Sequence, residues 1–223
     1  MILRSCLLLI AMALNGLSGA GSAIAGDPQA TEADWALIPA WCRFAMSARK
    51  TNNRVDQIPD PQLRAKIHAL DTSGCNGFHH YCWALIWANR GYFANSEDHA
   101  LRRSFFDWAI SDLNYILANS EPGNTCSLFP ETYTKMGEMK ILINKPQEAE
   151  TNYRAALKLK PGYAPAYAGL SDLYETQGHT DKAIAVLQAG LKVNPKSSAL
   201  KKKLARLQAR TAGASGDVRQ SPD

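Results

Sequence analysis

The sequence predicts an all-α protein: a right-handed solenoid of helical hairpins, with an irregular N-terminal helical cap and a C-terminal capping helix. The main observation is that residues 130–195 contain one pattern twice, 34 residues apart. The matched pairs are Tyr133 and Tyr167, Met136 and Leu170, Ala149 and Ala183, Tyr153 and Leu187, Ala156 and Gly190, and Pro161 and Pro195. A fixed period of this length is typical of a helical repeat array. The second observation is helical spacing inside the second copy, where apolar or small residues recur at i, i+3, i+4 and i+7 from Tyr167.

Residues 1–25 are predicted to be a secretory signal peptide. Arg4 supplies a positive start, and the apolar stretch at 6–17 is too short to span a bilayer. Residues 23–25, Ala-Ile-Ala, form a small-x-small cleavage site, so the mature chain would begin near Gly26. This predicts an exported, periplasmic protein; the alternative is a retained N-terminal anchor helix.

Export determines how the cysteines are interpreted, because an oxidising compartment favours disulfides. Four cysteines remain after the signal peptide, and four allow three pairings. Cys75 and Cys126 each lie in a loop just before a predicted helix, whereas Cys42 and Cys82 each lie inside a predicted helix beside Trp or Tyr. These similar environments favour Cys42–Cys82 and Cys75–Cys126.

Residues 26–77 are predicted to form the N-terminal helical cap. An apolar helix over 34–50 contains Pro39, which kinks or splits it. A second, short helix begins at 60–61, with Asp as N-cap and Pro at the first helical position, and ends near Gly74.

Residues 78–129 resemble a degenerate copy of the repeat with an insertion. Helices are predicted over 78–90 and 99–120, joined by an extended connector at 91–98. Whether this hairpin has true repeat geometry stays open. All five tryptophans precede the clear repeats, at positions 35, 41, 83, 87 and 108. They either fill the core of the cap or form an exposed platform for a sugar or a partner helix.

The two clear repeats span 130–163 and 164–197. In the second, Gly178 ends the first helix and Pro195 stops the second. The apolar and small positions are Tyr167, Leu170, Ser171 and Tyr174 on the first helix and Ala183, Leu187 and Gly190 on the second. This pattern resembles the tetratricopeptide repeat (TPR). The earlier copy carries Tyr133, Met136, Gly137, Ala149, Tyr153, Ala156 and Pro161, and departs from the TPR pattern at Lys140, where Tyr is usual.

Residues 198–211 are predicted to form an amphipathic capping helix. Leu200, Leu204 and Leu207 would face inward, and the outward residues are Lys201, Lys202, Lys203, Arg206 and Arg210. Such a polar cap keeps the last repeat from exposing an apolar face. Binding to an acidic membrane surface is the alternative. Residues 212–223 are small and polar and are predicted to be disordered.

The TPR resemblance implies a partner site, because the first helices of TPR arrays line a concave groove that binds peptides. The groove positions are Glu131, Thr134, Glu138 and Ile141, then Pro165, Ala168, Asp172 and Glu175, with His79, Asn89 and Arg90 from the degenerate copy. Such a groove would be acidic along the last two repeats, which favours a basic or neutral extended peptide. It disfavours a chaperone's C-terminal carboxylate, because Glu138 and Asp172 stand where some TPR domains use Lys and Asn. The competing interpretation of these carboxylates is simple solvation.

Chemistry receives little support from the sequence. His79, His80 and the cysteines could centre a small metal protein or enzyme, yet adjacent histidines point to different sides of a helix and disulfides compete for the thiolates. No nucleophile elbow, zinc-protease or C-x-x-C motif occurs. The net charge of +5 is too small to indicate a nucleic-acid partner. We therefore expect a non-catalytic scaffold or adaptor without cofactor or metal, acting in envelope assembly or export and binding a protein or extended peptide.

Overall fold

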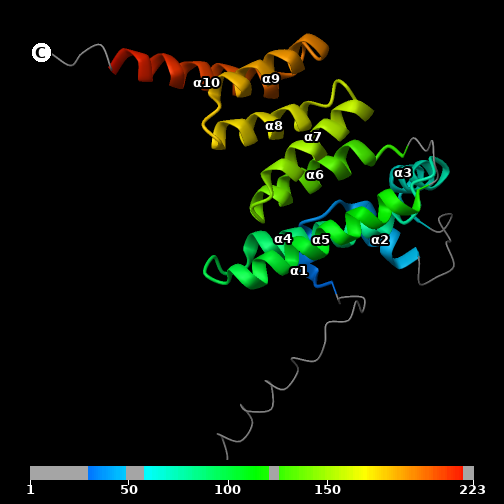
Figure 1. The fold of residues 1–223 in the computed structure, drawn as a ribbon. Coiled ribbons are helices and arrows are strands. Elements are labelled where there is room, and N and C mark those ends of the chain that lie inside the picture. The colour runs from blue at the N-terminus through cyan, green and yellow to red at the C-terminus, as the bar shows by residue number, and fades with distance from the viewer. Residues whose placement is uncertain (1–29, 49–57, 121–125, 218–223) are drawn as a thin grey trace, which may run out of the picture. The chain divides into compact units, whose positions relative to one another are not determined.

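The computed structural model describes residues 30–48, 58–120 and 126–217, and these contain ten α-helices and no strand (Figure 1). The helices are α1 (Glu32–Ala36), α2 (Ala40–Ala48), α3 (Pro61–Thr72), α4 (Phe78–Phe93), α5 (His99–Asn119), α6 (Phe129–Leu142), α7 (Pro146–Leu159), α8 (Ala164–Thr176), α9 (Thr180–Val193) and α10 (Ser198–Asp217). The chain divides into two units, 1–31 and 32–223, and every one of these helices belongs to the second. The predicted signal peptide, residues 1–25, lies outside the described residues.

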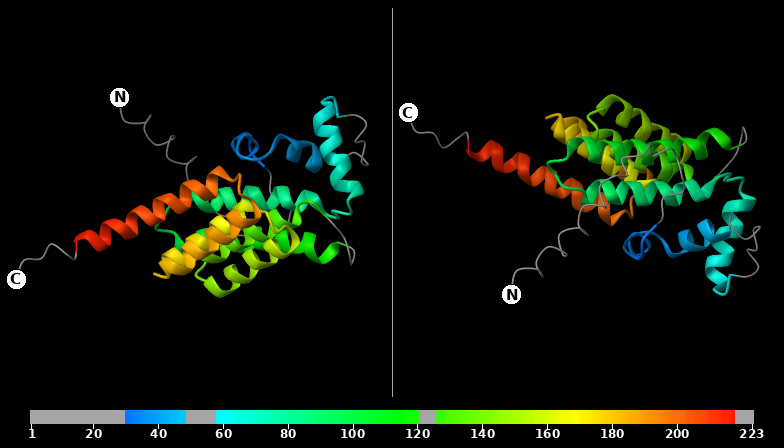
Figure 2. Two further views of the ribbon diagram at one scale, coloured as in Figure 1. Left: turned by 90° about the horizontal axis from the view of Figure 1, so that it is seen from above. Right: turned by 90° about the horizontal axis from the view of Figure 1, so that it is seen from below.

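Three helical hairpins, α4/α5, α6/α7 and α8/α9, follow one another along the second unit (Figure 1), and α10, drawn in red, projects past them (Figure 2). Consecutive hairpins are in contact, because α5 packs on α6 and α7 packs on α8. The first helices of the last two hairpins, α6 and α8, also touch directly, and α10 packs against both α8 and α9. These contacts confirm the predicted fold class of stacked helical hairpins.

Alternation of bulky and small residues explains how closely the helices approach. Tyr153 on α7 and Leu187 on α9 are fully buried, and Gly137 and Gly190 face bulky side chains across the helix pairs. A Cβ atom at Gly137 would lie 2.8 Å from Cε1 of Tyr153, and one at Gly190 would lie 2.7 Å from Cγ of Tyr167. Each glycine therefore leaves room for the ring that fills the hairpin core.

Local signals fix where several helices begin and end. The side chain of Asp60 accepts hydrogen bonds from the backbone N–H groups of Gln62 and Leu63, at 2.8 and 3.1 Å, and so caps α3. Gly178 adopts φ +76° after α8, in the left-handed region that only glycine enters without strain. Pro39 separates α1 from α2, because proline cannot continue a helix.

Two predicted boundaries were wrong. Residues 91–93, expected in an extended connector, continue α4, since Gly91 is buried against the ring of Phe106 on α5. Residues 212–217, expected to be disordered, extend α10. The first half of α10 is anchored by the buried side chains of Leu200 and Leu207, which are 0% and 2% exposed. Residues 218–223 lie outside the described part of the chain.

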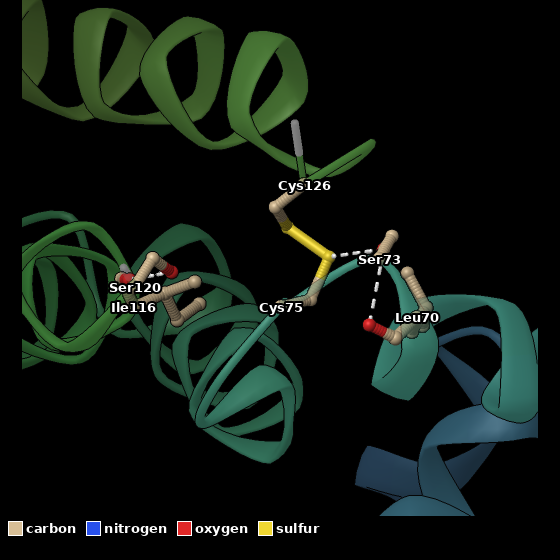
Figure 3. The surroundings of a disulfide bond; sticks show 6 residues. All are labelled: Leu70, Ser73, Cys75, Ile116, Ser120 and Cys126. Carbon is tan, nitrogen blue, oxygen red and sulfur yellow. Dashed lines mark hydrogen bonds between the residues drawn. A yellow bond between two sulfur atoms is a disulfide. The ribbon is translucent and has the colours of Figure 1, made fainter. Parts of the chain in front are cut away.

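Two disulfides join the cap to the hairpins. Cys42 on α2 bonds Cys82 on α4, and Cys75, just before α4, bonds Cys126, just before α6 (Figure 3). These are the pairs that the sequence analysis favours. Beside the second bridge, the hydroxyl of Ser73 donates to the carbonyl oxygen of Leu70 at 3.0 Å.

The tryptophans divide between core and surface. Trp41 is 8% exposed and stacks on Tyr81, with ring centroids 6.0 Å apart. Trp108 is 37% exposed and contacts Trp87, with centroids 4.9 Å apart. Core packing therefore explains the position of Trp41, whereas Trp108 is partly exposed to solvent.

Candidate partner-binding groove

A pocket of about 410 Å³ lies where α6 and α8 meet, and we call it the groove pocket. Its lining residues come from four helices: Tyr92 of α4; Glu138, Ile141 and Leu142 of α6; Tyr153 of α7; and Pro165, Ala168, Gly169 and Asp172 of α8. Apolar and aromatic groups make most of the wall, and two carboxylates complete it. Such a mixture suits a segment that buries carbon while presenting a polar or charged group.

The repeat period explains why two carboxylates reach one pocket. Glu138 and Asp172 are 34 residues apart, so they occupy the same position on the first helices of consecutive hairpins. Since α6 and α8 are in contact, both side chains line the same cavity. Tyr153 forms its floor, because the glycines at 137 and 169 admit the tyrosine ring between the two first helices.

Glu138 is the pocket carboxylate whose charge acts on both Tyr92 and Tyr153. Its carboxylate is 40% exposed and has a weak ion pair with Lys135 at 3.5 Å, one turn away. Burial, and then the charge of Glu138, raises the pKa of Tyr92 to about 12. The same two causes, in the same order, raise the pKa of Tyr153. Glu138 therefore adds negative potential at both phenols, although burial is the larger cause of the two pKa shifts.

Two of the other acids predicted for the groove, Asp172 in the groove pocket and Glu175 outside it, are engaged by α10. Asp172 forms a close ion pair with Lys203, and Glu175 pairs with Arg210 and, at 3.7 Å, with Arg206. The predicted acidic groove is thus partly neutralised by the chain itself. Arg206 lies 34 residues after Asp172, so α10 places a cation where the two preceding first helices place a carboxylate.

Two further residues that were predicted to line the groove instead make contacts that stabilise the fold. Thr134 is 3% exposed and donates a hydrogen bond to the carbonyl oxygen of Pro130 at 2.8 Å, so the prediction that it lines the groove was wrong. Glu131 accepts a 2.5 Å hydrogen bond from the hydroxyl of Tyr81, which ties α6 to α4. Neither residue belongs to the groove pocket.

Asn89 and Arg90, predicted to extend the groove onto α4, instead hold the segment that contains α1. The amide of Asn89 donates to the carbonyl oxygen of Leu37 at 3.3 Å. The guanidinium of Arg90 donates to both carboxylate oxygens of Asp34, at 3.2 and 2.8 Å. The cap therefore covers this part of α4, a packing that helical periodicity alone does not reveal.

Part of the repeat region matches a known protein family. Residues 144–207 match a family model described as tetratricopeptide repeat. This part of the chain is similar to tetratricopeptide repeats. This match covers all of α7, α8 and α9, and the first half of α10.

A solved TPR protein shares the fold of this chain. TTC0263, a thermophilic TPR protein from Thermus thermophilus, aligns with a TM-score of 0.53 and 18% identity, over 82% of this chain and 84% of that one. MamA aligns with a TM-score of 0.46 and 19% identity, over 74% and 83%. The first TPR of Spaghetti (RPAP3), bound to the HSP90 peptide SRMEEVD, aligns with a TM-score of 0.41 and 16% identity, over 58% and 96%. Among curated proteins, none matches this sequence.

Four lining residues of the groove pocket were not predicted from the sequence: Tyr92, Leu142, Tyr153 and Gly169. The sequence pattern places Tyr92 in a connector, and its position in the groove depends on the extra turn of α4. The same pattern places Tyr153 in the hairpin core alone. The glycine pair at 137 and 169, spaced to flank a bulky residue on the intervening helix, is the signal that could have revealed its second role.

The proposed metal or enzyme centre is dispersed. Nδ1 of His80 lies 2.6 Å from a carboxylate oxygen of Asp112, and its ring stacks on Tyr115 at 3.9 Å. His79 is half-buried, with its ring 4.5 Å from that of His80. The cysteines at 42, 75, 82 and 126 are all consumed by disulfides, so none offers a thiolate. Within the described ranges, no cluster of three or more His, Cys, Asp or Glu side chains could hold a metal ion.

A second pocket of about 590 Å³ lies on the second-helix side of the TPRs, between α7, α9 and the end of α8. Its centre is a closed network in which the hydroxyl of Tyr174 donates to Glu150 at 2.7 Å, and Arg154 donates to both. These groups satisfy one another, so the network chiefly fastens α8 to α7.

For the portion of the chain that can be described, no helix is both long and apolar enough to cross a membrane.

Proposed function

We propose that this protein is a non-catalytic TPR scaffold or adaptor that binds a protein partner, as an extended peptide, in the groove pocket. The supporting observation is that the pocket lies between the first helices of two consecutive repeats, and that apolar side chains at its edge are exposed to solvent. Tyr92 and Leu142 are each 46% exposed at its edge. An extended peptide could cover both side chains at once.

We also propose that the protein acts in the periplasm, in envelope assembly or export. The leader-like pattern of residues 1–25 supports this location, as do two disulfides that account for every cysteine after that segment. A membrane-surface role for α10 has less support, because Lys203, Arg206 and Arg210 already contact Asp172 or Glu175.

Site-specific photo-crosslinking in cells tests the groove proposal. A benzophenone amino acid replaces Ala168 in the groove pocket or, as matched control, Ala189, which is exposed on α9. We expect a discrete adduct from position 168 and none of the same mass from position 189. Equal adducts from both positions, or none from either, would refute binding in this groove.

Fractionation tests the location independently. We expect the processed chain in the periplasmic fraction, with no thiol available to alkylation until a reductant is added. A full-length chain in the cytosol with reactive thiols would refute export while leaving the groove proposal intact.

A further inference from the structure

The four carboxylates predicted for the groove, of which Glu138 and Asp172 line the groove pocket, differ in how strongly the chain itself engages them. Glu131 accepts a short hydrogen bond from Tyr81, and Glu175 is paired with two arginines of α10. Asp172 is paired closely with Lys203, although its side chain remains 50% exposed. The nearest charged partner of Glu138 is Lys135 at 3.5 Å, farther away than the nearest partner of each of the other three carboxylates, and the Glu138 side chain is 40% exposed. Glu138 is therefore the groove carboxylate best placed to receive a ligand's charge.

The surroundings of Glu138 suit a cation on an apolar stem. Leu142 and Ile141, one turn further along α6, give an aliphatic wall beside the carboxylate, and Tyr92 gives an aromatic face. Long basic side chains bury their methylene groups on apolar surface while the charged head finds a carboxylate or an aromatic ring. The pocket volume of about 410 Å³ accommodates one such side chain with room for water.

Resting on the proposed groove function, we infer that the groove pocket is a recognition site for one arginine or lysine side chain of the partner peptide, with Glu138 as its counter-ion. Tyr92 and Leu142 pack along the stem. Asp172 adds negative charge on the facing helix, and Lys203 limits that contribution. Beyond Asp172, Lys203 and Arg206 repel a second cation, so the site selects a single basic residue rather than a basic run.

Peptide binding to the full mature chain, with both disulfides formed, tests this inference. The probes are three acetylated and amidated pentapeptides, Ala-Ala-X-Ala-Ala, in which X is arginine, citrulline or norleucine. Citrulline keeps the shape of arginine without its charge, and norleucine keeps only the stem. Amide chemical shifts of α6 and α8, followed by NMR during titration at low salt, report the binding site and the dissociation constant.

We expect the arginine peptide to bind at least fivefold more tightly than the citrulline peptide, with shifts centred on Ile141, Leu142 and Ala168. Glu138→Gln should abolish that preference. The matched control is Glu97→Gln, which removes the same charge from an exposed position before α5. Tyr92→Ala provides a second variant, and we expect it to weaken the arginine and norleucine peptides alike.

Equal affinities of the arginine and citrulline peptides, or unchanged arginine binding by Glu138→Gln, would overturn the inference. Tight norleucine binding at the same amides would then leave the groove function standing with an apolar ligand. Failure of the arginine peptide to bind overturns the inference, and the crosslinking result decides separately whether the groove binds a partner.

Discussion

The ring of Tyr153 occupies the space that any side chain at position 169 would need. A Cβ atom at Gly169 would lie 2.5 Å from Cε1 and 2.9 Å from the hydroxyl oxygen of that tyrosine. On its other side, the same ring meets the backbone at Gly137, where a Cβ would lie 2.8 Å away. One side chain from α7 thus spaces the first helices of two consecutive repeats and forms the floor between them.

Gly169→Ala should therefore destabilise the protein. Because both contacts involve a fully buried ring, either the ring or α8 must shift, and overpacking of this kind typically costs about 1–3 kcal/mol. Urea unfolding followed by circular dichroism measures the change in free energy. Gly162→Ala is the control, since the nearest atom to its added Cβ is 3.9 Å away, and it should leave stability within about 0.5 kcal/mol.

A double-mutant cycle separates this clash from other effects of the alanine. The equivalent of Tyr153 in the next repeat is Leu187, so Tyr153→Leu is a substitution with precedent in the same chain. We expect the cost of Gly169→Ala to shrink in the Tyr153→Leu background, because the ring is gone. Strictly additive costs would show that the steric account is wrong.

Removing the Cys75–Cys126 bridge should lower stability more than removing an exposed side chain does. The bridge closes a loop with a sequence separation of 51, and a loop of that size corresponds to about 4 kcal/mol in the chain-entropy model. Thermal unfolding of the Cys75→Ser, Cys126→Ser double variant, compared with the parent under non-reducing conditions, measures the loss. An unchanged melting temperature would contradict a structural role for this bridge.

The ionisation of Tyr92 should report the charge of Glu138. The pKa of Tyr92 is raised to about 12 by burial first and by Glu138 second, so Glu138→Gln should lower that pKa while leaving it above 10. Ring-labelled tyrosine NMR between pH 9 and 12 would follow it. An unchanged pKa of Tyr92 in Glu138→Gln would show that the charge of Glu138 does not act on this phenol.

The same shift predicts how stability depends on pH. Tyr92 binds its proton more tightly in the folded chain than in the unfolded chain, because its folded pKa of about 12 exceeds the ordinary value of about 10. Its contribution to stability is complete below pH 10 and declines as the pH rises from there through 12. Denaturant unfolding of the parent and of Tyr92→Phe should therefore diverge in that window and agree at pH 7.

Lys203 should restrain the groove. Its side chain is 15% exposed and pairs with Asp172, so Lys203→Gln releases that carboxylate into the pocket. We expect affinity for the arginine pentapeptide to rise severalfold, with a stability loss below about 1 kcal/mol because Asp172 is half-exposed. Lys202→Gln, on the exposed side of the same helix, is the control for net charge. Equal gains in the two variants would mean that only net charge matters.

The repeat region was predictable because its period, its glycines and its alternation of large and small residues all act within neighbouring helices. Asp60, Pro39 and Gly178 begin or end helices as their local chemistry requires. The cap was harder, because Arg90 and Asp34 are far apart in sequence and meet only through tertiary packing.

The site illustrates the same division. The 34-residue period put Glu138 and Asp172 in one groove, yet it gave no information about their partners. The pairing of Asp172 with Lys203 depends on α10 continuing the stack at the same register, so a charge expected to face the partner is partly neutralised inside the chain. Thr134 was misplaced for a related reason: a hydroxyl that satisfies its own helix can be buried where the pattern suggests exposure.

The position of the Cys75–Cys126 bridge has a mechanical consequence. In sequence the two cysteines flank the whole of α4 and α5, and Cys42–Cys82 ties α2 to α4. A force applied to the cap is therefore transmitted through the disulfides to the start of α6, and it bypasses the first hairpin. Under tension, the load would reach α6 and the repeats after it without first unfolding α4 and α5.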